Sequence, residues 1–159
     1  MTCAVFGGGC LSTKGQPQGR PVDELADAWV PRPVALRIYP ATRFVVEDEV
    51  ATLDARVELF DTMGDTTKAS GLVRFELFDG PSGGNPVSGG PGLLYRWDIP
   101  LITLGDQRTY YDPVTATYAF PLKIDSRDAI KNAVYLRVTL NLAQGQRLND
   151  EQVVKTGWE

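Results

Sequence analysis

Three aspartates next to predicted strand ends could hold a metal ion, although their spacing matches no calcium-loop motif with defined ligand positions. Asp61 and Asp65 follow one such run and Asp79 ends the next, so a sandwich could cluster them at one end with Glu47 or Asp48. Hard oxygen ligands from adjacent loops are those that calcium prefers. Aspartate close to glycine is also a common turn former, whose side chain bonds its own backbone. Two interpretations stand, a calcium site and ordinary turns.

A second group that suits binding consists of aromatic residues between positions 95 and 118. Tyr95 and Trp97 are two positions apart in a predicted strand, so their side chains would face the same way. Tyr110 and Tyr111 are adjacent in the sequence. A ring that projects from a sheet offers a flat apolar platform on which a sugar can stack. The same side chains would otherwise pack in the core or at a sheet edge. These four residues are the candidate ligand-binding set, and their burial decides between the two interpretations.

Catalytic chemistry has few starting points in this chain. Histidine is absent, which removes the commonest general base, the commonest zinc ligand and the serine–histidine and cysteine–histidine nucleophile pairs. The acidic residues show no spacing that would place two carboxylates across a cleft for glycoside hydrolysis. The sequence therefore predicts a protein that is not an enzyme, with no catalytic residue and no cofactor apart from the calcium considered above.

The charge of the chain argues against nucleic acid as a partner. Sixteen basic and twenty acidic residues give a net charge of −4, and the basic residues are spread singly rather than clustered. Phosphate backbones are bound by concentrated positive charge, which this sequence lacks. The longest apolar run also falls far short of the roughly 18 residues that a membrane span requires. Any attachment to a membrane would therefore come from a lipid.

The first ten residues, MTCAVFGGGC, resemble the end of a bacterial lipoprotein signal peptide. In that family an apolar run ends in small residues directly before a cysteine that receives lipid, as Gly8 and Gly9 precede Cys10. The resemblance implies lipidation at Cys10 and a location in the cell envelope, periplasmic or anchored to the membrane by lipid. A basic segment is missing and the apolar run Ala4–Phe6 is short. The alternative is an N-terminal tail with two incidental cysteines on a cytoplasmic protein.

The chain divides into three parts. Residues 1–10 form the signal-like segment, and residues 11–33 form a flexible tether punctuated by glycine and proline. Within the tether, residues 22–29 fit a short helix with Leu25 and Trp29 on one face. Residues 34–159 carry the pattern of a single domain, long enough to bury a sizeable core.

Two strict alternations of apolar and polar residues define the architecture. In residues 51–60 and 134–142 every second residue is apolar and falls on one face of a strand, as in an antiparallel sheet with one solvated face. Residues 100–112 suggest an edge strand around Ile102 and a loop, and Pro121 moves its strand toward an edge. The remaining strands are expected at 34–39, 44–46, 72–78, 93–98, 117–124 and 152–156. The sequence predicts an all-β fold, an antiparallel β-sandwich of about seven or eight strands, with a closed barrel as the alternative.

The middle of the chain resembles bacterial immunoglobulin-like surface domains. In ARVELFDTMGD an alternating strand ends in Asp-x-x-Gly, and GLVRFELFDG is a strand that ends near Asp-Gly; YLRVTL, with Gly145 beyond it, fits the penultimate strand. The resemblance covers about a third of the chain and carries no catalytic residue. It implies a module of the cell envelope whose partner is a protein or a glycan. The expected function is binding or positioning another macromolecule, with carbohydrate binding through the aromatic set as the alternative.

Overall fold

The computed structural model describes residues 30–48, 50–80, 92–126, 130 and 132–157. Apart from residue 30, all of them belong to one compact unit, Pro31–Glu159. Cys10 and the helix expected at 22–29 lie outside the described residues. Within the described ranges the elements are β1 (Ala35–Ile38), β2 (Arg43–Glu47), β3 (Val50–Phe60), β4 (Gly71–Phe78), β5 (Leu93–Leu101), α1 (Leu104–Tyr110), β6 (Tyr111–Asp112), β7 (Thr117–Ile124), β8 (Ala133–Leu142) and β9 (Arg147–Lys155).

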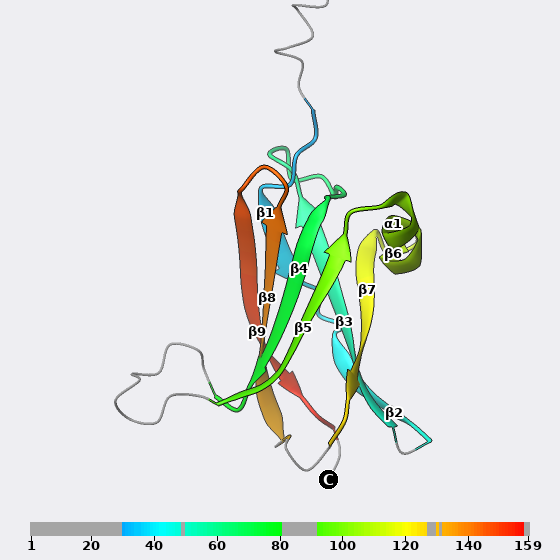
Figure 1. The fold of residues 1–159 in the computed structure, drawn as a ribbon, viewed down its shortest axis with the longest axis vertical. Helices are drawn as coiled ribbons and strands as arrows, with labels where there is room; N and C mark the ends of the chain where they lie inside the picture. The colour runs from blue at the N-terminus through cyan, green and yellow to red at the C-terminus, as the bar shows by residue number, and fades with distance from the viewer. Residues whose placement is uncertain (1–29, 49, 81–91, 127–129, 131, 158–159) are drawn as a thin grey trace, which may run out of the picture. The chain divides into compact units, whose positions relative to one another are not determined.

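The strands form two separate antiparallel sheets (Figure 1). One sheet has the order β1-β3-β7-β6, with β2 pairing the same edge of β3 as β1, and the other has the order β5-β4-β8-β9. This confirms the predicted all-β class with two antiparallel sheets. The strand positions also agree with the expected runs, including β2 at the predicted 44–46. The elements that were not expected are the short β6 and the helix α1. The edge strand expected around Ile102 is wrong, because β5 ends at Leu101 and the chain turns there into α1.

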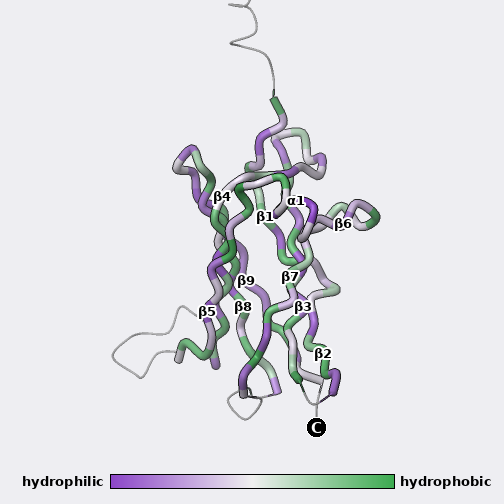
Figure 2. Tube along the Cα trace, turned by 45° about the vertical axis from the view of Figure 1, so that its right-hand side comes forward, coloured by the Kyte–Doolittle hydropathy of each residue, from purple (hydrophilic) through white to green (hydrophobic). Residues whose placement is uncertain are grey.

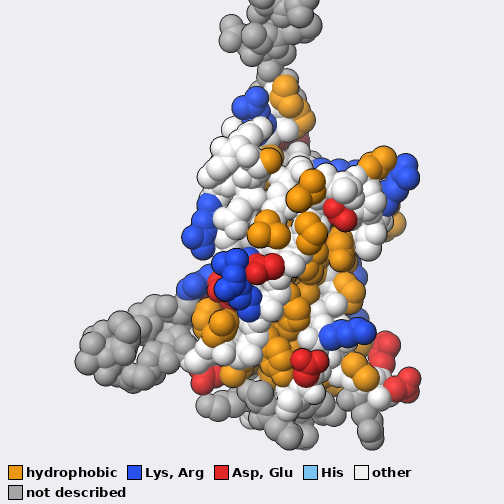
Figure 3. All heavy atoms as spheres, in the orientation of Figure 1, with side chains coloured by type: hydrophobic (Ala, Val, Ile, Leu, Met, Phe, Trp, Pro, Cys, Tyr) orange, Lys and Arg blue, Asp and Glu red, His pale blue; other side chains and the backbone are white. Residues whose placement is uncertain are grey.

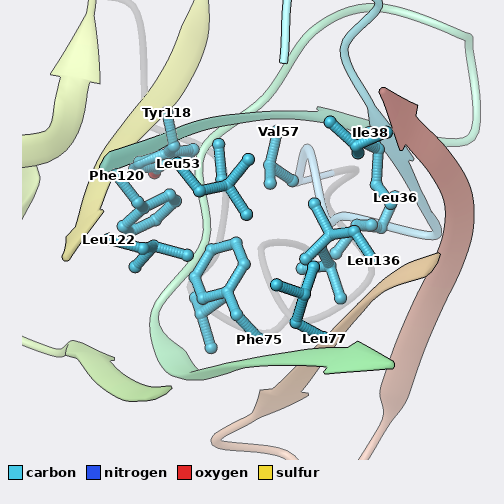
Figure 4. Packing of buried hydrophobic residues seen from close by; sticks show 14 of the residues in the cluster. Leu36, Ile38, Leu53, Val57, Phe75, Leu77, Tyr118, Phe120, Leu122 and Leu136 are labelled. Atoms are coloured by element: carbon cyan, nitrogen blue, oxygen red, sulfur yellow. The ribbon is translucent and has the colours of Figure 1, made fainter. Parts of the chain in front are cut away.

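The core lies between the sheets, and the two strongest alternations supply much of it. Leu53 and Phe120 are fully buried from one sheet, and Phe75 and Leu136 are fully buried from the other. Figure 4 shows these side chains pointing toward one another across the interior. Along the tube in Figure 2, hydrophobic and hydrophilic positions follow each other because successive side chains face opposite sides of a strand. The sequence pattern thus becomes one apolar layer per sheet.

A threonine side chain completes the ladder where β1 passes into β2. Tyr39 N–H donates to the carbonyl of Arg56 at 2.8 Å, and the chain then turns through residues 40–42 before pairing with β3 again. Within this turn Thr42 Oγ1 accepts from Arg56 N–H at 2.9 Å and donates to its carbonyl at 3.2 Å. Thr42 is buried, so its hydroxyl takes the place of the backbone group that a continuous strand would offer.

The helix α1 replaces the irregular loop expected around residues 104–110. Thr103 is its N-cap and accepts from Asp106 N–H at 3.1 Å, while the Asp106 carboxylate accepts from Thr103 N–H at 2.7 Å. This reciprocal pair is a capping box, which satisfies backbone N–H donors that the first turn of the helix leaves without a partner.

In the part of the chain that the structure describes, no helix has the length and apolar character needed to cross a membrane.

Candidate functional site

The predicted metal ligands do not come together. Asp61 is buried, and its Oδ1 accepts hydrogen bonds from the backbone N–H groups of Met63 at 2.9 Å and Asp65 at 3.1 Å. This is a turn held by its first side chain, the arrangement in which aspartate bonds the backbone two residues on. The Asp65 side chain is on the exposed surface of the same turn.

Asp79 lies at the other end of the sandwich. It follows β4, whereas Asp61 and Asp65 belong to the loop that precedes β4, and an eight-residue strand separates the two positions by about 26 Å. The Asp79 carboxylate accepts from Gly92 N–H at 2.6 Å. Among the described residues, no group of three or more His, Cys, Asp or Glu side chains is placed to hold a metal ion.

Tyr110 and Tyr111 pack against the sandwich beside α1. The Tyr110 ring stacks on Phe120 with centroids 4.9 Å apart, and the Tyr111 ring meets Tyr118 edge-on at 5.2 Å. Lys68 Nζ lies 4.0 Å from the Tyr111 ring centroid, so a cation covers one of its faces. Both tyrosines are half-buried, and their rings are used in packing rather than presented as an open platform.

Tyr118 links this end of the sandwich through its hydroxyl. The hydroxyl donates to Gln107 Oε1 at 2.5 Å and accepts from Ala69 N–H at 3.3 Å. Burial raises the pKa of Tyr118 above its ordinary value, against the opposing effect of these hydrogen bonds. The group is therefore a neutral structural connection between α1 and the loop before β4.

Described residues line an interior void and two surface hollows. An interior void of about 10 Å³ is lined by apolar core residues, which is room for roughly one water-sized sphere. A surface hollow of about 400 Å³ lies beside α1, and another of about 560 Å³ lies over β2 and β3. The first is lined by Lys68, Leu104, Gln107, Arg108, Tyr111 and Pro113.

Tyr95 and Trp97 form the other half of the predicted aromatic set and lie side by side on β5. Their rings are nearly parallel, with centroids 5.4 Å apart and 10° between the planes. Both are half-buried and pack against the core from its margin. The Tyr95 hydroxyl donates to the Ser126 carbonyl and accepts from the Ser126 N–H, each at 3.0 Å. This pair of bonds joins β5 to the segment that follows β7.

These aromatics belong to an apolar strip that we name the β5 seam. It consists of Leu94, Tyr95, Trp97 and Ile99, all half-buried and packed against the core cluster. Figure 3 shows hydrophobic side chains gathered in a band that runs lengthwise between the positions of β5 and β7 in Figure 1. The β5 seam thus places partly exposed apolar side chains next to an outer strand of a sheet.

Among the described residues, no strand pairs with the backbone of β5 along the same edge. Leu142 N–H donates to the Gln146 carbonyl, so the even residues of β8 bond β9 and its odd residues bond β4. The odd-numbered residues of β8 pair with even-numbered residues of β4, so the odd-numbered residues of β4 direct their backbone groups toward β5. They pair there with the odd-numbered residues of β5. The even-numbered residues Arg96 and Asp98 therefore direct their N–H and C=O groups away from β4. The outward set also includes Pro100, which has no N–H to donate.

The free stretch of β5 is short because both of its ends are interrupted. The register between β4 and β5 shifts beside Leu77, which marks a bulge at the start of β5. Pro100 limits the other end. The other sheet has a proline on its strand β7. Arg56 uses its backbone groups to bond the β1–β2 side, so the odd-numbered residues of β3 are those that bond β7. The register then directs the backbone of Pro121 away from β3. Pro100 on β5 and Pro121 on β7 thus each remove a backbone donor from the outer side of their strand. Arg96 and Asp98 remain as the part of β5 that can pair with another strand.

The exposed face of β5 carries a charge network next to this edge. Asp98 accepts from Arg74 Nε at 2.7 Å and lies 3.2 Å from Arg96. The hydrogen bond from Arg74 holds the pKa of Asp98 below its ordinary value, and it raises the pKa of Arg74. A basic residue, Arg96, and an acidic residue, Asp98, thus follow each other on the exposed face of β5.

Sequence patterns identified Tyr95 and Trp97 but not Arg96, Asp98 or Ser126 as parts of the site. The parity of β5 places Arg96 and Asp98 on the exposed face, and an outward backbone edge has no signature in the residues themselves. Pro100 was the available signal, because proline in a strand marks an edge position. Ser126 contributes through its backbone, which no side-chain pattern reveals.

Comparisons with known proteins add no relative. No family model, no curated protein and no solved structure matches the chain. The candidate site is therefore defined by the geometry of β5 and its surroundings alone.

Proposed function

We propose that this protein is a non-enzymatic binding module that holds another macromolecule along the free edge of β5. The observation that carries the proposal is the coincidence of two features on one strand. The β5 seam offers apolar surface, and directly beside it Arg96 and Asp98 offer backbone groups that point away from β4 and that no described strand pairs. A strand added at such an edge gains backbone hydrogen bonds and buries apolar side chains at the same time.

The topology supports an immunoglobulin-like assignment within this proposal. Such sandwiches place strands A, B, E and D in one sheet and C, F and G in the other, with an extra strand beside C in some members. The sheet orders β1-β3-β7-β6 and β5-β4-β8-β9 follow that arrangement if β5 is the extra strand beside C. The edge that we propose for binding is then the outer edge of this extra strand.

A photo-crosslinking experiment tests the proposed site. A benzophenone amino acid replaces Leu93 of β5 in one variant and Val46 of β2 in the control, two exposed apolar positions on edge strands of different sheets. Irradiation of cells that naturally make the protein is expected to give a discrete adduct from position 93 and none from position 46. Absence of an adduct at 93, or equal adducts at both positions, would contradict the proposal.

A location in the cell envelope remains part of the proposal and rests on the residues around Cys10. Gly8 and Gly9 before Cys10 support lipid attachment, which would hold the module at a membrane surface. Metabolic labelling with an alkyne fatty acid in a bacterial host tests this, with Cys10→Ser as the control. The wild-type chain is expected to carry the label and Cys10→Ser to lose it. A wild-type chain without label would contradict lipidation.

Carbohydrate binding is the second candidate, and the ring geometry of Tyr95 and Trp97 favours it. The two rings stack on each other, so an outer face of the pair is the apolar surface that a sugar ring would cover. Titration with soluble chitin- and cellulose-derived oligosaccharides, followed by the fluorescence of Trp97 in a Trp29→Phe, Trp158→Phe background, tests this function. A saturable change that Tyr95→Ala abolishes would support it, and no change would rule out these sugars.

A further inference from the structure

We infer that the β5 edge binds a second copy of this chain through a two-fold axis beside Trp97. The inference rests on the proposed function and names its partner. It starts from the outward backbone groups of Arg96 and Asp98, the part of the β5 edge that neither the bulge nor Pro100 interrupts. In a two-fold contact the same surface meets itself, so a strand that pairs with its copy must be complementary to its own reversed sequence.

The backbone permits this pairing in one register that also satisfies the charges. With the axis beside Trp97, Arg96 of one copy lies opposite Asp98 of the other, and both residues direct their backbone groups outward. Each Arg96–Asp98 pair then exchanges both of its backbone hydrogen bonds, as antiparallel hydrogen-bonded pairs do. Opposite charges that face each other across strands also stabilise the pairing, by about 0.2–1 kcal/mol for each pair.

The neighbouring registers are disfavoured by the same side chains. An axis beside Arg96 would place two arginines opposite each other, and an axis beside Asp98 would do the same with two aspartates. Like charges directly opposite are destabilising. The second of these registers also brings Arg96 opposite Pro100, which cannot donate. The sequence Arg-Trp-Asp therefore selects one alignment.

The apolar side of the strand gains from the same alignment. Trp97 would face Trp97 of the second copy in a non-hydrogen-bonded pair, the closer kind of cross-strand contact. Tyr95 would lie opposite Ile99, so each half of the β5 seam would cover the other. Aromatic pairs and pairs of aromatic with β-branched residues are among the favourable cross-strand contacts. The two sheets that contain β5 would become one continuous sheet.

Charge variants of the full chain test this arrangement in solution. Arg96→Asp and Asp98→Arg each place like charges opposite each other in the dimer, so each variant alone is expected to sediment as a monomer. In an equimolar mixture of the two variants, every facing pair again has opposite charges, and a heterodimer is expected. The matched control is Arg43→Asp, which makes the same charge change on the edge strand β2 and should leave the wild-type dimer intact. All samples contain a reductant, because Cys3 and Cys10 would otherwise allow disulfide dimers.

A disulfide trap tests the register itself. In a Cys3→Ser, Cys10→Ser background, Trp97→Cys places its two copies about 4.5 Å apart between Cα atoms, which is within disulfide range. Arg96→Cys places its copies diagonally, about 7–8 Å apart. Mild oxidation is expected to give a covalent dimer of the first variant at least tenfold faster than of the second.

Several outcomes would overturn the inference. A wild-type chain that stays monomeric up to about 1 mM, a dimer unaffected by both charge variants, or a mixture that fails to associate would each do so. These results would contradict self-association only, because the photo-crosslinking experiment tests the proposed binding site separately. A crosslink from position 93 to a different protein, with a monomeric wild-type chain, would uphold the binding site and contradict self-association.

Discussion

Asp150 on β9 accepts a hydrogen bond from the backbone N–H of Ile38 on β1 at 2.8 Å, and this bond joins the two sheets at one side of the sandwich. Ile38 pairs with Val57 of β3 in a register that directs its own N–H away from β3, toward the free edge. A carboxylate from the facing sheet thus satisfies a donor that would otherwise be left over. The contact between β1 and β9 closes this side, whereas the β5 seam lies at the other.

Asp150→Ala is expected to destabilise the protein by about 1–3 kcal/mol, because it leaves the Ile38 N–H without a partner in a partly buried position. Asp150→Asn retains an acceptor oxygen and should cost less. Urea unfolding followed by circular dichroism measures both free energies. Equal losses in the two variants would show that the hydrogen bond does not contribute and that the charge does.

Thr42→Val is expected to cost about 1–3 kcal/mol of unfolding free energy, although valine has almost the same shape. The substitution removes the hydroxyl that bonds both the N–H and the carbonyl of Arg56 inside a buried turn. Thr42→Ser keeps the hydroxyl and should lose less. If valine and serine were equally tolerated, the hydroxyl would not complete the ladder as described.

Asp61→Ala is expected to lower the unfolding free energy by about 1–3 kcal/mol, because the backbone N–H groups of Met63 and Asp65 lose their acceptor. Asp65→Ala removes an exposed side chain and should change it by less than about 0.5 kcal/mol. Added calcium is expected to leave the melting temperature of the wild-type chain unchanged, as measured by differential scanning fluorimetry. A calcium-dependent rise that Asp61→Ala abolishes would instead show a metal site.

Tyr118→Phe is expected to be less stable than the wild type at neutral pH, since Ala69 N–H and Gln107 Oε1 lose a partner. Burial raises the pKa of Tyr118 in the folded state above the ordinary value of 10.0. The unfolded chain therefore releases this proton first, and wild-type stability falls as the pH rises above 10.0. The difference between the two proteins should narrow over that range in urea titrations. A constant difference would contradict the raised pKa.

Asp106→Asn tests the capping box at the start of α1. Hydrogen bonds from the Thr103 and Ile102 N–H groups hold the pKa of Asp106 below its ordinary value of 3.8. The charged carboxylate therefore contributes stability above that ordinary value, and the contribution disappears as the pH falls through the lowered pKa. The stability advantage of the wild type over Asp106→Asn is expected at neutral pH and should vanish in strong acid. A difference that does not depend on pH would show that the charge plays no part.

The strands were predictable because burial is periodic along them. In residues 51–60 and 134–142 every second side chain faces the core, and that period is written in the sequence. The helix α1 was not predicted, because its seven residues contain no buried side chain and hence no apolar periodicity. Its only local signal is the spacing of Thr103 and Asp106, which fits a capping box.

The candidate site was predictable only in part. The shared parity of Tyr95 and Trp97 indicated that both rings face the same way, and their stacked geometry agrees with this. The separation of Asp79 from Asp61 follows from the direction of β4, and turn composition alone does not reveal it. The outward edge of Arg96 and Asp98 depends on which strands pair and in which register, a long-range property of the fold.

The contact between β1 and β9 also decides how the unit would respond to a pulling force. β1 begins opposite Phe60, next to the loop before β4, while β9 ends opposite Ala133, at the other end of the sandwich (Figure 1). The chain thus enters the unit at one end and leaves it at the other, and its first and last strands lie side by side. Tension between these two points would load β1 and β9 in shear, with the bond from Ile38 to Asp150 lying across the direction of pull. Such a module resists mechanical extension because its two terminal strands would have to slide past each other, which breaks their contacts together. Peeling would instead break these contacts one after another.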